Sequence, residues 1–129
     1  MRPMANDMGM CGIEQMFYAG TIAYDDTDVD KGIALFTAPN KMMITRAVAV
    51  VTEAFNASST NVVVVGTKDD DDAIMASADI TEGTAGTYSK QTFVDIPKGG
   101  KVLAKYTQTG TSATAGAVDI YLFAVGVAE

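Results

Sequence analysis

The sequence predicts an all-β protein: a single-domain β-sandwich or barrel of jelly-roll type, with seven to eight strands and an extended N-terminal arm. Short runs of β-branched and aromatic residues recur along the 129-residue chain and are separated by turn-forming residues. No strong helical period of apolar residues interrupts them. Hydrophobic residues make up 48% of the chain, which is enough for one buried core. We therefore divide the chain into an arm, residues 1–12, and a β-sandwich domain, residues 13–129.

The arm is marked by four methionines, Met1, Met4, Met8 and Met10. It lacks the apolar period of a free-standing helix or strand. Flexible thioether side chains conform to irregular surfaces, so we expect the arm to contact a partner molecule. Packing of the arm against its own domain is the alternative. Cys11 is interpreted as a small apolar residue, because no basic residue adjoins it to activate the thiol.

Two short strands are predicted after the arm. Residues 16–24 are rich in β-forming residues and end in an acidic turn. Residues 33–37 form a second run, which ends at residues 38–41, where proline and asparagine favour a turn. Phe17 and Tyr18 are interpreted as core residues of the first strand, because large aromatic side chains more often pack inside than serve as interface anchors.

Residues 43–55 form the longest predicted strand. Side chains alternate between the two faces of a strand, so residues of one parity share a face. Both parities are apolar here: one carries Ile44, Val48 and Val50, and the other carries Ala47, Ala49, Val51 and Phe55. This pattern predicts that both faces are covered, one by a second sheet and the other by a neighbouring subunit.

The second half of the chain continues the pattern of short strands. Residues 61–65 return as a strand after a small-polar turn, and residues 73–78 are either a single helical turn or a bent strand. Further strands are predicted over residues 88–96, 101–107 and 117–127. Residues 101–107 alternate between apolar and mainly basic residues, whereas residues 117–127 form a long strand with apolar residues on both faces. The small residues 110–116 are predicted to form a hairpin loop between them.

The composition excludes most catalytic chemistry. The chain has no histidine, which removes Ser-His-Asp and Cys-His arrangements and the commonest protein metal ligand. No glycine-rich phosphate-binding motif is present. A glycosidase needs only a pair of carboxylates, but the chain has no tryptophan on which a sugar would stack. We therefore predict a protein that is not an enzyme and uses no cofactor.

Charge and hydropathy narrow the partners and the compartment. The net charge of −7 disfavours nucleic acid and anionic membranes, because both attract clustered lysine and arginine. No apolar run of about 18 residues could span a bilayer, and the N-terminus lacks the apolar core of a signal peptide. A single cysteine permits no intrachain disulfide. These features predict a soluble protein made in a cytoplasm.

Two acidic clusters are the candidate binding motifs. Asp26, Asp28 and Asp30 have the spacing that begins a calcium loop, but the glycine comes one residue late and the closing glutamate is missing. The second cluster consists of Asp69, Asp70, Asp71 and Asp72. Mutual repulsion favours a solvated loop there, and the alternatives are a bound cation or a basic patch on a partner. We assign no metal ligand to either cluster.

Several motifs occur together in residues 44–80. The segment reads I-T-R-x-V-x-x-V-T-x-A-F-N, then V-V-V-G-T, an Asp-rich loop and A-D-I, and T-A-G-A-V-D-I-Y follows near the C-terminus. In these motifs the chain resembles small structural proteins of tailed bacteriophages. The resemblance covers residues 44–80 and 110–125, and residues 1–40 carry no matching marker.

The resemblance implies a capsid decoration, or cement, protein with a jelly-roll-like β fold. Its expected partners are the major capsid protein and further copies of itself, with a trimer favoured over a dimer. It would sit on the exterior of the virion capsid after synthesis in the host cytoplasm. The candidate partner contacts are Met1, Met4, Met8 and Met10 in the arm, and Asp69, Asp70, Asp71 and Asp72 in the acidic loop.

Two alternatives remain open from the sequence. The chain could be another phage structural module, such as a tail, fibre or head-fibre protein. It could also be a β-sandwich module of a different class that binds carbohydrate or calcium.

Overall fold

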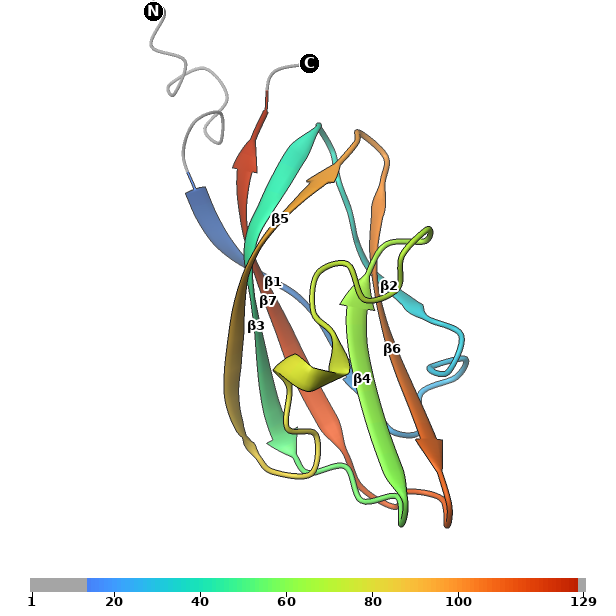
Figure 1. Cartoon of the computed structure of the whole chain (residues 1–129). Helices are drawn as coiled ribbons and strands as arrows, with labels where there is room; N and C mark the ends of the chain where they lie inside the picture. The colour runs from blue at the N-terminus through green and yellow to red at the C-terminus, as the bar shows by residue number, and fades with distance from the viewer. Residues whose placement is uncertain (1–13, 128–129) are drawn as a thin grey trace, which may run out of the picture.

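Seven strands form two antiparallel sheets that stack as a sandwich in the computed structural model, which describes residues 14–127 (Figure 1). The four-stranded sheet has the order β1 (Glu14–Ala23), β7 (Ala117–Gly126), β3 (Met42–Glu53) and β5 (Gly86–Ile96). The three-stranded sheet has the order β2 (Ile33–Thr37), β6 (Lys101–Thr109) and β4 (Thr60–Gly66). The predicted all-β sandwich is confirmed. The predicted arm, with its four methionines and Cys11, lies outside the described residues.

Consecutive strands alternate between the two sheets, an arrangement typical of jelly-roll sandwiches. The segment after β4 lies beside the free edge of that strand and makes one antiparallel bridge, between Val65 and Met75. A short 3-10 helix, η1 (Ser77–Asp79), follows at once. Both alternatives for residues 73–78 are therefore partly right. This bridge lies at the edge of β4, the position at which an eighth strand would pair.

The predicted hairpin between the last two strands is wrong. β6 belongs to the three-stranded sheet and β7 to the four-stranded sheet, so residues 110–116 cross from one sheet to the other. Gly116 closes this crossing with a φ of 146°, and its carbonyl accepts a hydrogen bond of 3.0 Å from the N–H of Tyr24. An apolar alternation shows that a strand has a buried face, but it does not show which strand lies next to it.

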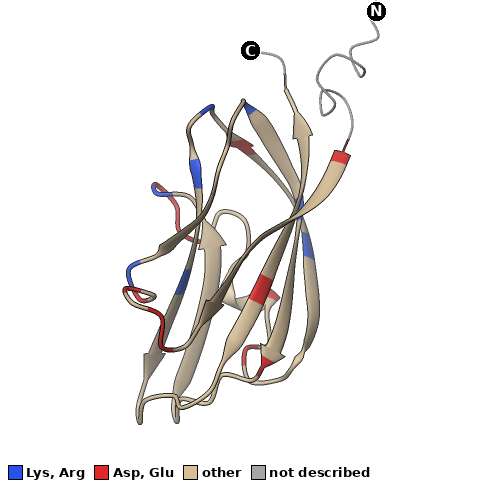
Figure 2. Ribbon diagram, turned by 180° about the vertical axis from the view of Figure 1, so that it is seen from behind, with Lys and Arg blue, Asp and Glu red and all other residues tan. Residues whose placement is uncertain are grey.

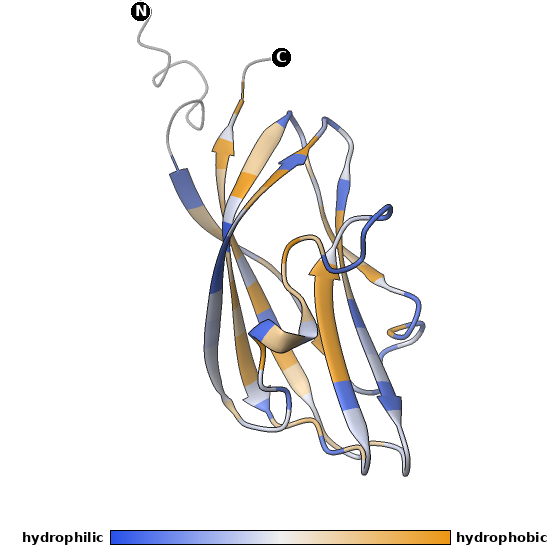
Figure 3. Cartoon of the chain, in the orientation of Figure 1, coloured by the Kyte–Doolittle hydropathy of each residue, from blue (hydrophilic) through white to orange (hydrophobic). Residues whose placement is uncertain are grey.

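The core lies between the sheets and is built from alternate residues of the strands. The inward residues of β6 are Val102, Ala104 and Tyr106, and those of β7 are Val118, Ile120, Leu122 and Ala124. Hydrophobic residues run along the strands of both sheets, while hydrophilic ones gather in the loop after β4 (Figure 3). Among residues 14–127, no helix is long and apolar enough to cross a membrane.

The parity predicted for the longest strand is wrong over part of its length. A bulge lies between Ile44 and Arg46, where β3 carries one residue more than β7. The bulge shifts the alternation, so Ile44 faces the core together with Ala47 and Ala49. Val48 and the other even residues beyond the bulge face the opposite side of the sheet and stay partly exposed.

Two polar side chains tie the connecting segments to this core. The Tyr106 hydroxyl donates a hydrogen bond of 2.6 Å to Oδ1 of Asn61, and the Tyr106 ring lies 4.5 Å from the ring of Phe55. The buried Glu82 carboxylate accepts hydrogen bonds from the N–H of Val63, at 2.9 Å, and from the hydroxyl of Ser77, at 2.7 Å. A buried polar group is stabilising only when it is paired in this way.

We expect Tyr106→Phe to lower the free energy of unfolding by about 1 kcal/mol at neutral pH, because one buried hydrogen bond is lost. Burial and the charge of Glu82 raise the pKa of Tyr106 above its usual 10.0. The folded wild type therefore holds this proton more tightly than the unfolded chain and loses stability as the pH rises above that value. The variant is spared this loss, so its deficit should shrink in alkali. Urea unfolding measures both effects.

The matched control is Tyr88→Phe. In the wild type, the hydroxyl of Tyr88 donates a hydrogen bond of 2.8 Å to the carbonyl of Thr84 at an exposed position. Water replaces that hydrogen bond, so the expected loss is close to zero. Equal losses in the two variants would contradict the role assigned to the buried Tyr106 hydroxyl.

Candidate functional site

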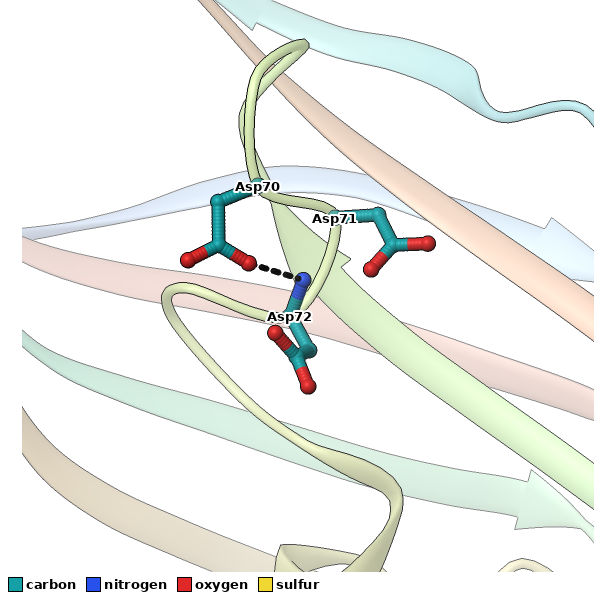
Figure 4. Close-up of side chains that lie close together, drawn as sticks. All are labelled: Asp70, Asp71 and Asp72. Atoms are coloured by element: carbon teal, nitrogen blue, oxygen red, sulfur yellow. Dashed lines mark hydrogen bonds between the residues drawn. The ribbon is translucent and has the colours of Figure 1, made fainter.

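The acidic loop after β4 is the first candidate site. Its chain turns back on itself, because the N–H of Thr67 donates to the carbonyl of Asp70 at 2.8 Å. Asp72 donates its N–H to Oδ1 of Asp70 at 3.4 Å (Figure 4). A side chain at Gly66 would collide with the carbonyl oxygen of Asp70, so the turn requires glycine at the end of β4. The predicted loop is confirmed as an ordered turn with exposed carboxylates.

One lysine ties this loop to the three-stranded sheet. Nζ of Lys105, on β6, lies 2.5 Å from Oδ2 of Asp71. Both side chains are partly exposed, so solvent screens the pair and its contribution to stability is small. The contact joins the loop to the outer side of the three-stranded sheet, because Lys105 lies between the inward-facing Ala104 and Tyr106 on β6. Asp69 stays exposed and is not part of this pair.

The carboxylates of Asp70, Asp71 and Asp72 lie within 4.8 Å of one another (Figure 4). The pKa of Asp72 is raised above its usual 3.8, first by its side-chain hydrogen bond with Asp70 and then by the negative charge of that neighbour. All three groups are exposed and come from consecutive residues. Exposed acidic groups of this kind are common without a cation, so the arrangement is assigned no metal.

The acidic turn after β1 has a structural explanation. Oδ2 of Asp26 accepts the N–H of Ala23 at 2.8 Å, and Asp28 adopts a positive φ of 62° and lies 3.6 Å from Nζ of Lys31. Short-range hydrogen bonds of aspartate are typical of turns. The predicted acidic turn is confirmed.

A cleft of about 450 Å³ opens beside the acidic loop. It is lined by the beginning of the loop, including Lys68 and Asp69, and by the turn between β5 and β6, including Pro97 and Gly99. Most of its lining surface is apolar. Asp69, the acidic residue of the lining, is exposed, and the cleft offers a mainly apolar surface for contact.

The second candidate site is the outer face of the four-stranded sheet, the side turned away from the core. Register and burial place these apolar residues on it: Met16, Tyr18, Met43, Val48, Val50, Phe93, Tyr121, Phe123 and Val125. Met16, Tyr18 and Phe93 are more than half exposed, at 57%, 55% and 67%. No other element of residues 14–127 covers this face (Figure 1). A contiguous apolar patch on a sheet face is typical of a protein contact.

The core role predicted for Tyr18 is wrong, and that for Phe17 is right. Phe17 turns inward and lies 4.7 Å from the ring of Phe36. Tyr18 stands on the outer face, where its ring lies 5.4 Å from that of Tyr121. Neighbouring residues of a strand point to opposite faces, so both could not enter one core.

Within the four strands of this sheet, Arg46 is the only cation that points to the outer face. The bulge turns it away from the core, next to Phe123 on β7 and Gln91 on β5. Its side chain is half-buried, yet it has no hydrogen-bond or ion-pair partner within residues 14–127. Charges are sparse along the strands of this sheet (Figure 2). The outward-facing acids of this sheet include Glu14, Asp95 and Asp119.

The structure separates the predicted site residues into two groups. Asp69, Asp70, Asp71 and Asp72 lie together on one exposed loop. Met1, Met4, Met8 and Met10 lie outside the described residues, so their contacts stay predictions. The sequence analysis missed Arg46 and Phe93 as site residues. The two-sided apolar pattern of residues 43–55 was the signal for the outer face, and the bulge obscured which residues belong to it.

Solved structures with this fold include chains from two phage capsids. A chain of the cyanophage Pam1 capsid asymmetric unit matches with a TM-score of 0.65 at 14% sequence identity, covering 87% of this chain and 84% of that chain. A chain of the acidic stable capsid structure of Helicobacter pylori bacteriophage KHP30 matches with a TM-score of 0.53 at 12% identity, covering 90% and 99%. At these identities the likeness establishes the fold alone. No protein family model and no curated protein match the chain.

We expect Asp72→Asn to stabilise the protein at neutral pH. The raised pKa means that the folded state favours the protonated carboxyl, so ionisation costs stability as the pH rises above 3.8. The amide removes this cost, and the advantage of the variant should disappear below that pH. Thermal unfolding at neutral and acidic pH measures the difference.

The matched control is Asp69→Asn, which removes the same charge from the same loop outside the three-carboxylate cluster. A smaller gain in this control is expected. Equal gains would show that general charge relief, and not the contact between Asp70 and Asp72, is responsible.

Proposed function

We propose that this chain is a non-enzymatic structural protein of a bacteriophage virion, and more narrowly a protein that decorates and cements the outside of the capsid. The carrying observation is the shared fold: chains of two phage capsid structures match almost the whole of this sandwich. The sequence motifs of residues 44–80 support the same class independently. A structural role needs no active site, and the chain has no histidine to build the commonest ones.

The buried chemistry of the described residues also supports a structural role. Glu82 and Thr45 are the buried polar residues there, and both are engaged in hydrogen bonds that hold the fold together. A catalytic carboxylate would instead face a cleft with its hydrogen-bonding capacity free for a substrate. The accessible surfaces of this protein are suited to contact with other proteins.

The proposed partners are the major capsid protein and further copies of this chain, with a trimer favoured over a dimer. The methionines of residues 1–12 would clamp a neighbouring capsid subunit, because thioether chains conform to irregular apolar surfaces. The exposed loop of Asp69, Asp70, Asp71 and Asp72 would face a basic patch of that subunit. The net charge of −7 repels packaged DNA and anionic membranes, which supports a place on the capsid exterior.

Purification of the virion followed by separation of heads and tails tests this proposal. Mass spectrometry should find the chain in the head fraction, and electron cryomicroscopy should place its sandwich on the outer capsid lattice. Detection in tails alone would overturn the decoration role but would leave a virion structural role, as a tail or fibre module. Absence from both fractions would overturn the virion role itself.

Deletion of residues 1–12 should weaken binding to undecorated heads at least about tenfold, because apolar anchors supply most of the affinity of a protein interface. Cosedimentation of the purified protein with such heads measures the change. The variant with both Asp69→Asn and Asp71→Asn tests the acidic loop by the same assay. Its binding to heads should depend less on salt concentration than wild-type binding, because two charges that salt would screen are removed. Unchanged head binding after the deletion would contradict the clamp.

A further inference from the structure

We propose that the outer face of the four-stranded sheet is the contact between copies of this chain, with Arg46 of one copy paired to Asp95 of the next. The proposal names the interface of the oligomer suggested above. It rests on the proposed function only for the place of that oligomer in a virion.

The apolar content of this face calls for an occupant. Phe93, on the edge strand β5, and Met16 and Tyr18, on the edge strand β1, are the exposed large hydrophobic residues of the described chain, and all three lie on this one face. Tyr121 and Phe123 of β7 continue the patch between them. Aromatic residues, methionine and arginine are the residue types enriched in protein interfaces.

The outer side of the other sheet is different. There β6 presents Lys101, Leu103 and Lys105 outward, and the acidic loop folds over it through the contact of Asp71 with Lys105. That side is therefore charged and partly covered by the chain itself. Among residues 14–127, the large hydrophobic residues that are more than half exposed all lie on the outer face of the four-stranded sheet, and none lies on that of the three-stranded sheet.

The unpaired charges of the face complement each other. Arg46 and Asp95 both point outward, and neither side chain has a hydrogen-bond or ion-pair partner within residues 14–127. Glu14 and Asp119 are already engaged, because they accept hydrogen bonds from Thr45 and Thr21. One free guanidinium and one free carboxylate on the same face make that face self-complementary, since the cation of one copy meets the acid of another.

Electrostatics favour this face over the rest of the surface for contact between copies. Each copy carries a net charge of −7, so two copies repel one another unless they meet where charge is sparse or balanced. The outer face meets the first condition, because the strands of this sheet carry few charged side chains (Figure 2). The acidic loop meets neither, because it would oppose like charges.

The area is sufficient for a specific interface. The four strands have 10, 12, 11 and 10 residues. At strand spacings of about 4.8 Å and rises of about 3.3 Å, the face measures roughly 33 Å by 19 Å. Two such faces bury about 1,200 Å², the lower end of the range for stable complexes. Burial of the whole face against the same face of a second copy gives a closed pair, whereas a ring of three would divide the face between two neighbouring copies.

Charge reversal with rescue tests the pairing. Light scattering of the full chain should show an oligomer for the wild type, whereas Arg46→Asp and Asp95→Arg should each raise the dissociation constant at least about tenfold. The double variant, which exchanges the two charges, should restore the oligomer. Lys68→Asp is the control, because it makes the same charge change as Arg46→Asp in the exposed loop that follows β4 of the other sheet.

Phe93→Ser tests the apolar part of the contact. Its side chain is exposed, so the variant should keep the thermal stability of the dissociated wild-type chain while losing the oligomer. A wild type that is monomeric at all concentrations, or variants that keep the wild-type mass, would overturn the proposal. A monomeric wild type whose Phe93→Ser variant no longer binds heads would assign the face to the capsid instead. None of these outcomes depends on whether the chain is found in heads or tails.

Discussion

One extra residue in β3 decides which side of the four-stranded sheet becomes core. Ile44 pairs with Ala124 of β7, and both point inward. Strict alternation from Ile44 would bring Arg46 into the core as well, and a buried guanidinium without a partner is strongly unfavourable. The bulge at Thr45 reverses the alternation, keeps Arg46 outside and returns Ala47 to the core. The hydroxyl of Thr45 shares its one proton between the carboxylate of Glu14 and the carbonyl of Phe123, so this buried group is paired.

The loops depend on the sheets through a few polar contacts. Glu82 links the segment before β5 to β4 through Val63 and to η1 through Ser77. Its carbonyl also accepts the N–H of Phe55 at 2.9 Å, which joins the segment that leaves β3. These bonds hold the connections at fixed places on the sandwich. The acidic loop can therefore be exposed and charged without disturbing the core.

Two surfaces of opposite character result from this arrangement, a charged loop tip and an apolar sheet face. The role proposed above would require contacts with copies of this chain and with a capsid, each through a distinct surface. The sandwich supplies both while its interior stays fully paired, since no buried side-chain polar atom among the described residues lacks a hydrogen bond.

The sequence by itself determined the fold class, the approximate strands and the acidic loop. Those features depend on neighbouring residues: period-two apolar runs, turn-forming residues and the repulsion of consecutive aspartates. Tertiary structure decided the rest, because it depends on contacts between distant segments. The pairing of β7 with β1 and β3 turned the expected hairpin at residues 110–116 into a crossing between sheets. A bulge defined against β7 placed Arg46 outside, and only the assembled sheet brought Tyr18 and Phe93 from opposite edges onto one face.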